Sequence, residues 1–423
     1  MMETASHDLR QDTAHCVICP QCDWVAHLEP PAPHELACCP RCRHVIASGP
    51  TRPPQHAIAW ALGALILLLL VFAFEFLGFD ARGINHTMSY FDALRTFYDY
   101  GFPILALLVA LTTVVLPALF LAAAIYTSLA ALTQPPLPLA ITAARLAYGI
   151  RHWMMSDVML VGILISLIKI ITLADIAPGP SFAVFCAFCV LLLKTMNMLD
   201  WTQLWLAIAG PGAGLPRLRP GATGRSQHAA PCRTCGTAFH TRGTHRCPRC
   251  GRRHWLQRMA RLQLTWALLL TSLLLYIPAN VFPIMHTQAL FGSEAQTIAG
   301  GVLQLIAMGS WPIALIIFSA SIVVPLTKIA ALAWLCLCSH YGWHRNSAVQ
   351  ARLFRITERI GRWSMIDVFV VAILAALVQA GVFMSIKPGP AVLAFAAVVI
   401  MTMVAAETFD TRLLWPEQEK TQS

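Results

Sequence analysis

The chain has 423 residues, of which 57% are hydrophobic and only 12% are charged. Because soluble domains usually carry about 25% charged residues, this composition excludes an ordinary soluble enzyme or binding domain. The net charge of +10 could suit a nucleic-acid binder, but the basic residues are distributed as membrane topology requires.

The chain begins with a polar, cysteine-rich region, and not with the basic and then apolar pattern of a cleavable signal peptide. Cys19-x-x-Cys22 is followed by Cys39-x-x-Cys42. Two such pairs supply four thiolates in the tetrahedral arrangement of a structural zinc site. We therefore expect residues 1–50 to form an N-terminal zinc ribbon.

Eight long apolar runs follow in two groups of four, and each run is long enough to cross a membrane as a helix. The first group lies near residues 57–77, 102–133, 156–177 and 181–208. We assign this group to a first transmembrane bundle, residues 51–209, because only helices and closed barrels satisfy all their backbone polar groups in lipid.

A second ribbon is expected between the two groups, within residues 210–256. This region opens with a linker rich in Gly, Pro and Arg and then contains Cys232-x-x-Cys235 and Cys247-x-x-Cys250. Neither set of four cysteines leaves an open coordination position, so we expect two structural zinc ions and not catalytic ones. Ribbons of this size depend on their metal for folding.

Two other interpretations of the cysteines stay open. The pairs could form disulfides or a thioredoxin-like redox centre, although the cytosol keeps thiols reduced and no βαβ pattern surrounds the motifs. Cys16 and Cys38 lie beside the first site, and either could replace a neighbouring ligand.

The second group of apolar runs lies near residues 263–283, 302–338, 364–384 and 390–409. It predicts a second transmembrane bundle over residues 257–415, followed by a short cytosolic tail, 416–423. Between its second and third runs, residues 339–362 carry five arginines. This stretch predicts an amphipathic helix on the inner leaflet, with a solvated charged helix as the alternative.

The two bundles resemble copies of one another. Trp153-Met-Met-Ser-Asp157 matches Trp363-Ser-Met-Ile-Asp367, and at the same offset Pro178-Gly-Pro180 matches Pro388-Gly-Pro390. We expect the Pro-Gly-Pro motifs to form tight outside turns between the third and fourth helices of each half. Since each half has an even number of spans, the repeat is parallel. The predicted fold is an all-α integral membrane protein with two tandem four-helix bundles, each preceded by a small cytosolic zinc ribbon.

The basic residues indicate the orientation of the chain. Of the 30 Lys and Arg residues, 24 lie in segments that are cytosolic if the N-terminus is cytosolic. Three lie in outside loops, and Lys169, Lys194 and Lys328 lie within predicted spans. This asymmetry is the positive-inside rule, so both termini are expected in the cytosol, and the net charge indicates topology and not a nucleic-acid partner.

A few polar side chains lie within the predicted spans, where an ionisable group costs about 2.5–3.5 kcal/mol and therefore faces a cavity or a partner. Ser321, Pro325 and Lys328 follow a helical repeat, and Pro325 is expected to kink the helix. We hypothesise that one polar cavity of the second bundle is lined by Ser321, Lys328, Ser364, Asp367 and Thr402, with Lys169 opposite them from the first bundle. The alternative is a set of scattered structural hydrogen bonds between helices.

The plan of two ribbons and two bundles resembles the paraquat-inducible protein A family. Three segments carry the resemblance: Tyr276-Ile-Pro-Ala-Asn-Val-Phe-Pro-Ile-Met285, Ser321-Ile-Val-Val-Pro-Leu-Thr-Lys328 and Gly361-Arg-Trp-Ser-Met-Ile-Asp367. Within that family the chain is similar to the lipid-transport members. The resemblance also implies that the six cavity residues named above match a polar network of the family.

The resemblance implies a Gram-negative inner-membrane protein that pairs with a periplasmic MCE-domain protein. The implied function is transfer of membrane phospholipid between the inner membrane and the tunnel formed by that partner, which contributes to envelope integrity. No Walker-type loop is present, and we expect a transport component and not an enzyme. The alternatives are an ion-coupled small-molecule exporter and a membrane thiol or quinone oxidoreductase that uses the cysteine pairs.

Overall fold

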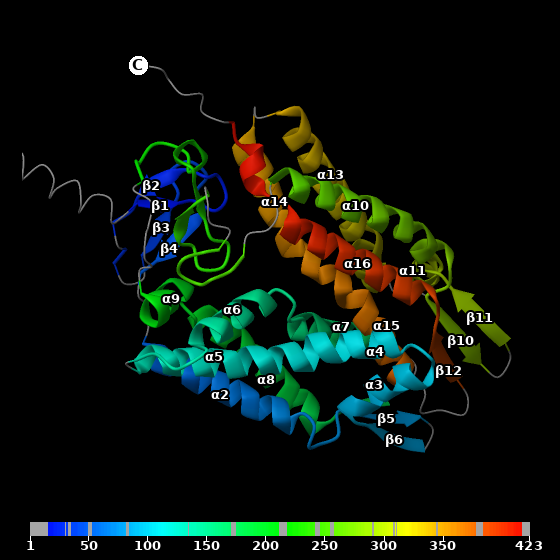
Figure 1. Cartoon of the computed structure of the whole chain (residues 1–423). Coiled ribbons are helices and arrows are strands. Elements are labelled where there is room, and N and C mark those ends of the chain that lie inside the picture. The colour runs from blue at the N-terminus through cyan, green and yellow to red at the C-terminus, as the bar shows by residue number, and fades with distance from the viewer. Residues whose placement is uncertain are drawn as a thin grey trace, which may run out of the picture.

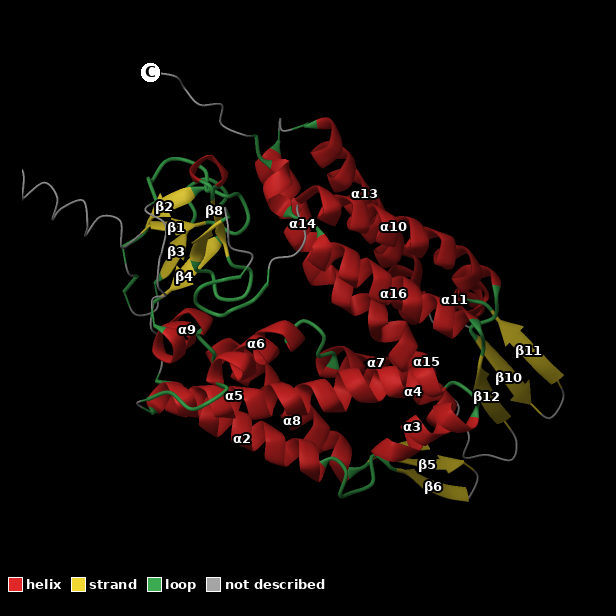
Figure 2. Cartoon of the chain, in the orientation of Figure 1, coloured by secondary structure: helices red, strands yellow, loops and turns green. Residues whose placement is uncertain are grey.

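The computed structural model describes residues 16–29, 31–32, 35–49, 53–81, 84–133, 135–170, 175–210, 218–241, 246–253, 258–289, 292–307, 309, 311–343, 346–377 and 384–416. This part of the chain is mostly helical. Two helical bundles lie side by side, with small cysteine-rich β-structures at one end and two small sheets at the other (Figure 1, Figure 2).

Three antiparallel β-hairpins build the cysteine-rich end, and a Cys-x-x-Cys segment forms the turn of each. Their strands are β1 (Cys16–Ile18) with β2 (Val25–His27), β3 (Leu36–Cys38) with β4 (Val45–Ser48), and β8 (Ala229–Pro231) with β9 (Ala238–His240). The turn that carries the fourth cysteine pair is closed by a bridge between Arg246 and Arg253.

The first bundle follows the first pair of hairpins. Its α2 packs against α5 and α8. Proline occupies the first turn of α2, α4 and α8, where its missing N–H would have had no helical partner. In chain order its helices are α2 (Pro54–Leu70), α3 (Tyr90–Asp99), α4 (Pro103–Ala110), the π-helix η2 (Leu111–Val115), α5 (Leu116–Leu132), α6 (Ala140–Ile150), α7 (Ser156–Ile170), α8 (Pro180–Met198) and α9 (Trp201–Ala209).

The second bundle has the same order of elements. Its α10 packs along α16 and also contacts α13. In chain order its helices are α10 (Arg258–Val281), α11 (Ile298–Ala307), α12 (Trp311–Phe318), the π-helix η4 (Ser319–Val323), α13 (Val324–Tyr341), α14 (Ser347–Gly361), the 3-10 helix η5 (Arg362–Met365), α15 (Ile366–Leu377), α16 (Ala391–Thr408) and the 3-10 helix η7 (Thr411–Leu414).

A three-stranded antiparallel sheet closes the far end of each bundle (Figure 2). In the first bundle the strand order is β6-β5-β7, formed by β5 (Leu77–Ala81), β6 (Ile84–Met88) and β7 (Asp175–Pro178). In the second the order is β11-β10-β12, formed by β10 (Met285–Ala289), β11 (Gly292–Gln296) and β12 (Met384–Pro388). The mostly helical architecture is as expected, but the sequence did not predict these sheets.

The sheets also change the role of the Pro-Gly-Pro motifs. Each motif joins the third strand of its sheet to the last helix of its bundle, and does not form a bare turn between two helices. A Cβ added to Gly179 would collide with the carbonyl oxygen of Glu75, and one added to Gly389 with that of Pro283. Glycine is therefore required at both positions because the backbones approach so closely.

The two bundles meet through the third long helix of each, α7 and α15 (Figure 1). A Cβ on Gly162 of α7 would lie 3.0 Å from the Cβ of Phe369 on α15, which shows how closely the helices approach. Ser166 Oγ lies 2.9 Å from the carbonyl oxygen of Gly162 in its own helix and 3.5 Å from that of Val370 across the interface. The repeats therefore pack face to face at their centre.

Five described helical segments are long and apolar enough to cross a membrane: Pro103–Leu132, Pro180–Met198, Met259–Val281, Ala314–Tyr341 and Ala391–Thr408. Three shorter apolar helices accompany them, Pro54–Leu70, Ser156–Leu167 and Ile298–Ala307. Large apolar side chains on their outer faces are exposed, for example Ile104 at 71% and Leu274 at 68%. Apolar surface of this extent suits contact with lipid, so the chain is a multi-pass membrane protein.

The structure corrects several of the eight expected spans. The run 302–338 is not one helix, because α11 ends before Gly309, whose φ is +77°, and α12 begins after it. The run 181–208 is broken at Asp200, whose carboxylate accepts from the backbone N–H groups of Thr202 and Gln203 and so caps α9. The run 57–77 extends past α2, which ends at Leu70, and the runs 156–177 and 364–384 end within strands β7 and β12.

The arginine-rich stretch 339–362 is divided between two helices. Its first residues complete α13, which ends at Gly342 in the left-handed conformation with φ of +66°. Its remainder forms α14, which buries Ala351 and Phe354 and exposes Arg352 and Arg359. The helix is therefore amphipathic.

Candidate functional site

Each ribbon gathers four cysteine sulfurs around one point. In the first, Cys19 and Cys42 have sulfurs 3.5 Å apart, as do Cys22 and Cys39. In the second, the Cys232–Cys250 and Cys235–Cys247 separations are 3.6 and 3.5 Å. All four sulfurs of each set lie within 4.8 Å of one another and are buried, so each set could hold a metal ion.

One turn geometry brings the sulfurs together in all four Cys-x-x-Cys segments. In the first segment, the N–H of Cys19 donates to the carbonyl of Trp24, and the N–H of Asp23 donates back to the carbonyl of Cys19. The same two bonds recur in the other three turns. The residue after the second cysteine always has a positive φ: Asp23, Arg43, Gly236 and Gly251 at 62°, 56°, 72° and 69°. The two glycines that follow cysteines in the second ribbon therefore serve the turn.

The donor set fits a zinc ion. Tetrahedral Zn–S bonds of about 2.3 Å place sulfurs roughly 3.8 Å apart, close to the separations in both ribbons. Hydrogen bonds with the neighbouring cysteines, first with Cys19, and burial raise the pKa of Cys22 well above its usual range. Hydrogen bonds with neighbouring cysteines, first with Cys235, and burial also raise the pKa of Cys232 well above its usual range. A divalent cation at the centre would remove this penalty by stabilising four thiolates together.

The two ribbons pack on each other and form one body. Ile18, Val25, Leu218 and Ala229 form a shared apolar cluster. A backbone hydrogen bond also joins the two ribbons, because the N–H of Val25 donates to the carbonyl of Ala222 at 2.9 Å.

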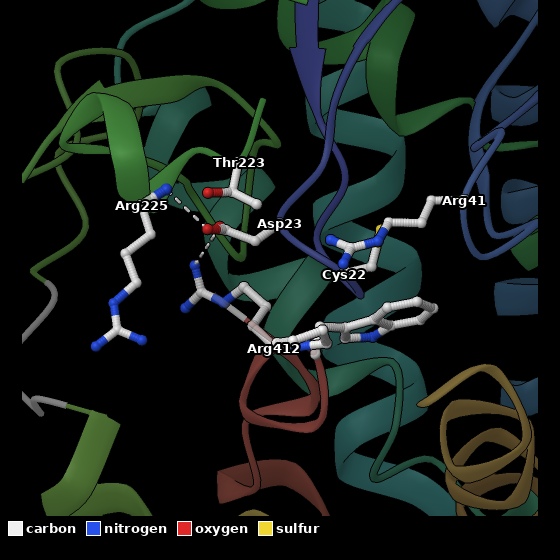
Figure 3. A pocket seen from close by; sticks show the side chains of 8 residues that line it. Cys22, Asp23, Arg41, Thr223, Arg225 and Arg412 are labelled. Carbon is white, nitrogen blue, oxygen red and sulfur yellow. Dashed lines mark hydrogen bonds and ion pairs between the residues drawn. The ribbon is translucent and has the colours of Figure 1, made fainter. Parts of the chain in front are cut away.

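Ion pairs fasten this body to the end of the second bundle that carries η7. Asp23 Oδ2 accepts from the backbone N–H of Arg225 at 2.8 Å, and Asp23 Oδ1 lies 3.7 Å from Nη1 of Arg412 (Figure 3). Arg412 also makes two bonds to the carboxylate of Asp410, at 2.9 and 2.7 Å. Asp410 in turn lies 3.5 Å from Nη2 of Arg233 in the second ribbon. We call these four side chains, Asp23, Arg233, Asp410 and Arg412, the ribbon clamp.

A second arginine contact lies beside the clamp. The guanidinium of Arg41 lies 5.2 Å from the ring centroid of Trp24 and 4.7 Å from that of Trp415. Trp415 also packs against the first cysteine cluster. A zinc ion with four thiolates carries a net charge of −2, so arginines at its edge stabilise the loaded ribbon. The small pocket between Arg41, Arg225 and Arg412 (Figure 3) therefore fits a structural role.

The polar residues expected in the second bundle are buried where the structure describes them. Ser321, Lys328, Ser364 and Thr402 are 1%, 3%, 1% and 1% exposed. The segments that carry Ser321 and Ser364, η4 and η5, contact each other, and η5 also contacts α16, which carries Thr402. Three of the six expected residues therefore lie on neighbouring segments.

Their hydrogen bonds are mostly local. Ser321 Oγ donates to the carbonyl of Ile317 at 2.7 Å, and Thr402 Oγ1 donates to that of Val399 at 2.9 Å. Ser364 Oγ has no hydrogen-bond partner within the described residues. Lys169 lies on α7 and Asp367 on α15, but their side chains fall outside the described part of the structure.

The kink expected at Pro325 is a π-helical turn. The N–H of Val324 donates to the carbonyl of Ser319, five residues earlier, and Pro325 has no N–H to continue the regular pattern. The first bundle has the same turn, in which the N–H of Leu116 donates to the carbonyl of Leu111 just before Pro117. Such π-turns are frequent at functional sites.

In the first bundle, side chains from other segments hold the π-turn. Tyr90 on α3 bonds to Thr113 Oγ1 at 2.6 Å. The hydroxyl of Ser156 donates to the carbonyl of Thr113, and the N–H of Met155 donates to that of Thr112, both at 3.2 Å. The start of α7 and the start of α3 thus fix η2 in place.

The second bundle replaces these groups. The positions of Tyr90, Thr112 and Ser156 are taken by Ile298, Ala320 and Ile366, as the matching starts of the helices show. Moreover, Phe120 of the first bundle is replaced by Lys328. The second π-turn therefore lacks the two hydroxyl groups, of Tyr90 and Ser156, that fasten the first, and a buried lysine lies one helical turn beyond it.

Sequence reasoning missed the ribbon clamp and the groups around η2. A signal for the π-turns was present, because hydroxyl residues precede the proline by four residues in both halves, Thr113 before Pro117 and Ser321 before Pro325. No local signal links Asp23 to Arg412.

The whole length of the chain has known relatives. The family model described as "Paraquat-inducible protein A" matches residues 55–209 and 262–419. The intermembrane transport protein PqiA of Escherichia coli K12 is 37% identical over 408 residues, which cover 96% of this chain and 97% of the relative.

Two further relatives have similar coverage. The lipophilic envelope-spanning tunnel protein A of E. coli K12 is 31% identical over 402 residues, 95% of this chain and 91% of that protein. A probable intermembrane transport protein of Haemophilus influenzae is 30% identical over 393 residues, 90% of this chain and 91% of that protein. No solved structure matches the chain.

Proposed function

The chain belongs to the paraquat-inducible protein A family, and from this we propose that it is the inner-membrane component of an intermembrane lipid transport system. It would move phospholipid between the inner membrane and a tunnel formed by a periplasmic MCE-domain protein, and so contribute to envelope integrity. The observation that carries the proposal is the match over 96% of the chain to a relative named for intermembrane transport. A second relative is named for an envelope-spanning lipophilic tunnel.

We place the phospholipid site in the second bundle, around Lys328. This ammonium lies within the segment Ala314–Tyr341, yet it is only 3% exposed, so it is enclosed by protein. A buried cation within a membrane span is expensive and usually functional. A phosphate headgroup would form a charge-assisted contact with this ammonium. The hydroxyl of Ser364 on the adjoining η5, which has no hydrogen-bond partner in the described part of the chain, would donate to the same headgroup.

The other members of this site are Lys169, Ser321, Asp367 and Thr402. The replacement of Phe120 by Lys328 supports the choice of the second bundle over the first, because the two halves otherwise share their elements. In this arrangement the first bundle is the structural half, and its fastened π-turn suits that role.

We propose that both cysteine clusters hold structural zinc. The domain division that follows is an N-terminal ribbon, 1–50, a first bundle, 51–209, a linker and second ribbon, 210–256, a second bundle, 257–415, and a tail, 416–423. The ribbons and the two sheets lie at opposite ends of the bundles (Figure 1), so the ribbons would face the cytosol and the sheets the periplasmic partner.

The test compares two lysines in predicted spans. Lys328→Ala should abolish transfer of a fluorescent phospholipid from vesicles containing the chain to the purified MCE protein, while the protein still accumulates in the membrane. Lys194→Ala should transfer at the wild-type rate, because Lys194 is exposed on the outer side of α8. Full transfer by Lys328→Ala would refute the site.

The same assay separates the alternatives. Flux of a small molecule that needs no MCE protein would indicate an exporter, and thiol or quinone turnover by the purified chain would indicate an oxidoreductase. The zinc content tests the ribbons independently, since about two tightly held ions per chain are expected.

A further inference from the structure

Gly361, the last residue of α14, has backbone dihedral angles that any residue can adopt. Its φ and ψ are −59° and −24°, ordinary right-handed helical values. Alanine is a much better helix former than glycine, so the backbone gives no reason for glycine here. The reason must lie in the space beside it.

That space is filled by the end of the Lys328 side chain. A Cβ on Gly361 would lie 2.7 Å from Nζ of Lys328, 2.8 Å from Cε and 3.3 Å from Cδ. Carbon atoms do not approach other heavy atoms so closely without displacing them. The missing side chain of Gly361 therefore forms the recess that receives the ammonium of Lys328.

The recess lies at a favourable place for a cation. The last carbonyl groups of an α-helix carry the negative end of its dipole, and at Gly361 the chain changes from α14 to the 3-10 helix η5. Glu358, three residues earlier on α14, adds a negative charge near this end of the helix. The ammonium thus lies beside the last residue of α14, next to the start of η5, whose Ser364 hydroxyl has no hydrogen-bond partner within the described residues.

The first bundle differs at both positions of this pair. Phe120 replaces Lys328, and Arg151 replaces Gly361 at the end of α6. The guanidinium of Arg151 instead lies 3.9 Å from the ring centroid of Tyr148 on its own helix. The glycine therefore occurs in the half that has the buried lysine, and is absent from the half that lacks it.

We propose that Gly361 is a positioning residue: its missing side chain lets the end of α14 hold the ammonium of Lys328 where the phosphate of the transported lipid binds. This inference rests on the proposed function and names the residue that sets the geometry of its site.

The test is Gly361→Ala. The colliding atoms are the far end of a flexible side chain, so the methyl group displaces the ammonium and leaves the bundle folded. We expect phospholipid transfer to the MCE protein to fall at least 10-fold, while the Tm stays unchanged or rises by about 2 °C because alanine favours the helix. The matched control is Gly149→Ala near the end of α6, where an added Cβ meets nothing within 4 Å. Its transfer should be unchanged.

A double variant separates positioning from general damage. In the Lys328→Ala background, where transfer is already lost, Gly361→Ala should not change the amount of phospholipid retained by the purified protein. A change in retained phospholipid in that background, or a lower Tm for Gly361→Ala, would overturn the inference, because the glycine would then act through the bundle and not through the lysine. If Lys328→Ala abolishes transfer but Gly361→Ala preserves it, the positioning role of Gly361 is refuted and the proposed site stands. If Lys328→Ala keeps full transfer, the proposed site itself fails.

Discussion

Replacing Asp410 by asparagine removes the central charge of the ribbon clamp with little change of shape. The side chain of Asp410 is 2% exposed and that of Arg412 11%, so both charges are largely withdrawn from water. Loss of one partner from a buried ion pair costs about 3–5 kcal/mol, because the other charge stays buried. Since Asp23 still lies 3.7 Å from Arg412, we expect the lower end of this range, about 3 kcal/mol.

The cost should appear as local opening and not as global unfolding. A loss of about 3 kcal/mol corresponds to roughly 150-fold faster amide exchange, at 1.36 kcal/mol per factor of ten. We expect this increase by hydrogen exchange mass spectrometry in residues 409–416, where the N–H groups of Leu413 and Trp415 close η7. The bundle helices should keep their protection.

The corresponding residue of the first half is the control. Asp200 caps α9 through two backbone N–H groups, so Asp200→Asn should cost about 1 kcal/mol and affect exchange near α9 only. Unchanged exchange of residues 409–416 in Asp410→Asn would refute the idea that the clamp fastens the ribbons to the second bundle.

Three other predictions follow from the ribbons and the first bundle. Cys22→Ser should lower the zinc content from about two to about one ion per chain by plasma mass spectrometry, because the loss of one of four thiolates opens the site; retention of both ions would contradict the assignment. Tyr90→Phe removes a buried hydrogen bond to Thr113 and should cost about 1 kcal/mol, measured as a lower Tm in detergent, whereas an unchanged Tm would mean that η2 is held without it. Phe120→Ala should lower the free energy of unfolding by about 3–5 kcal/mol, and with it the Tm, because the ring is 1% exposed. Leu274→Ala on the outer face should change the Tm little. Equal losses of Tm would argue against this division into core and lipid-facing surfaces.

The features that local pattern determines were predictable. Each Cys-x-x-Cys turn is closed by bonds within six residues, so the spacing alone indicated the two clusters. Hydropathy likewise located the helices, because a span differs from its surroundings over about 20 residues. The constant offset between the halves predicted a repeat, and the structure repeats its elements in the same order.

Features that depend on distant pairing were not predictable from the pattern. The strands of the two sheets are only four or five residues long, and the third strand of each sheet comes from a segment far along the chain. Their apolar residues merged with the adjoining helical runs, so the predicted spans were too long. The recess for Lys328 depends on α14 folding back along α13, which no single segment encodes.

The repeat itself holds a sequence signal for the proposed site. Where two copies of one fold differ at buried positions, the difference indicates a specialised function. The sequence itself shows that Phe120 of the first half corresponds to Lys328 of the second, and that Arg151 corresponds to Gly361. The physical reason for the second difference required the position of the lysine ammonium.

Transfer of phospholipid in a purified system tests the central claim most directly. Vesicles that contain the chain and a headgroup-labelled phospholipid would be mixed with the purified periplasmic MCE protein, and label bound to that protein would be measured over time. The account predicts transfer that requires the chain and is lost in Lys328→Ala. Equal transfer from vesicles without the chain, or undiminished transfer by Lys328→Ala, would contradict it.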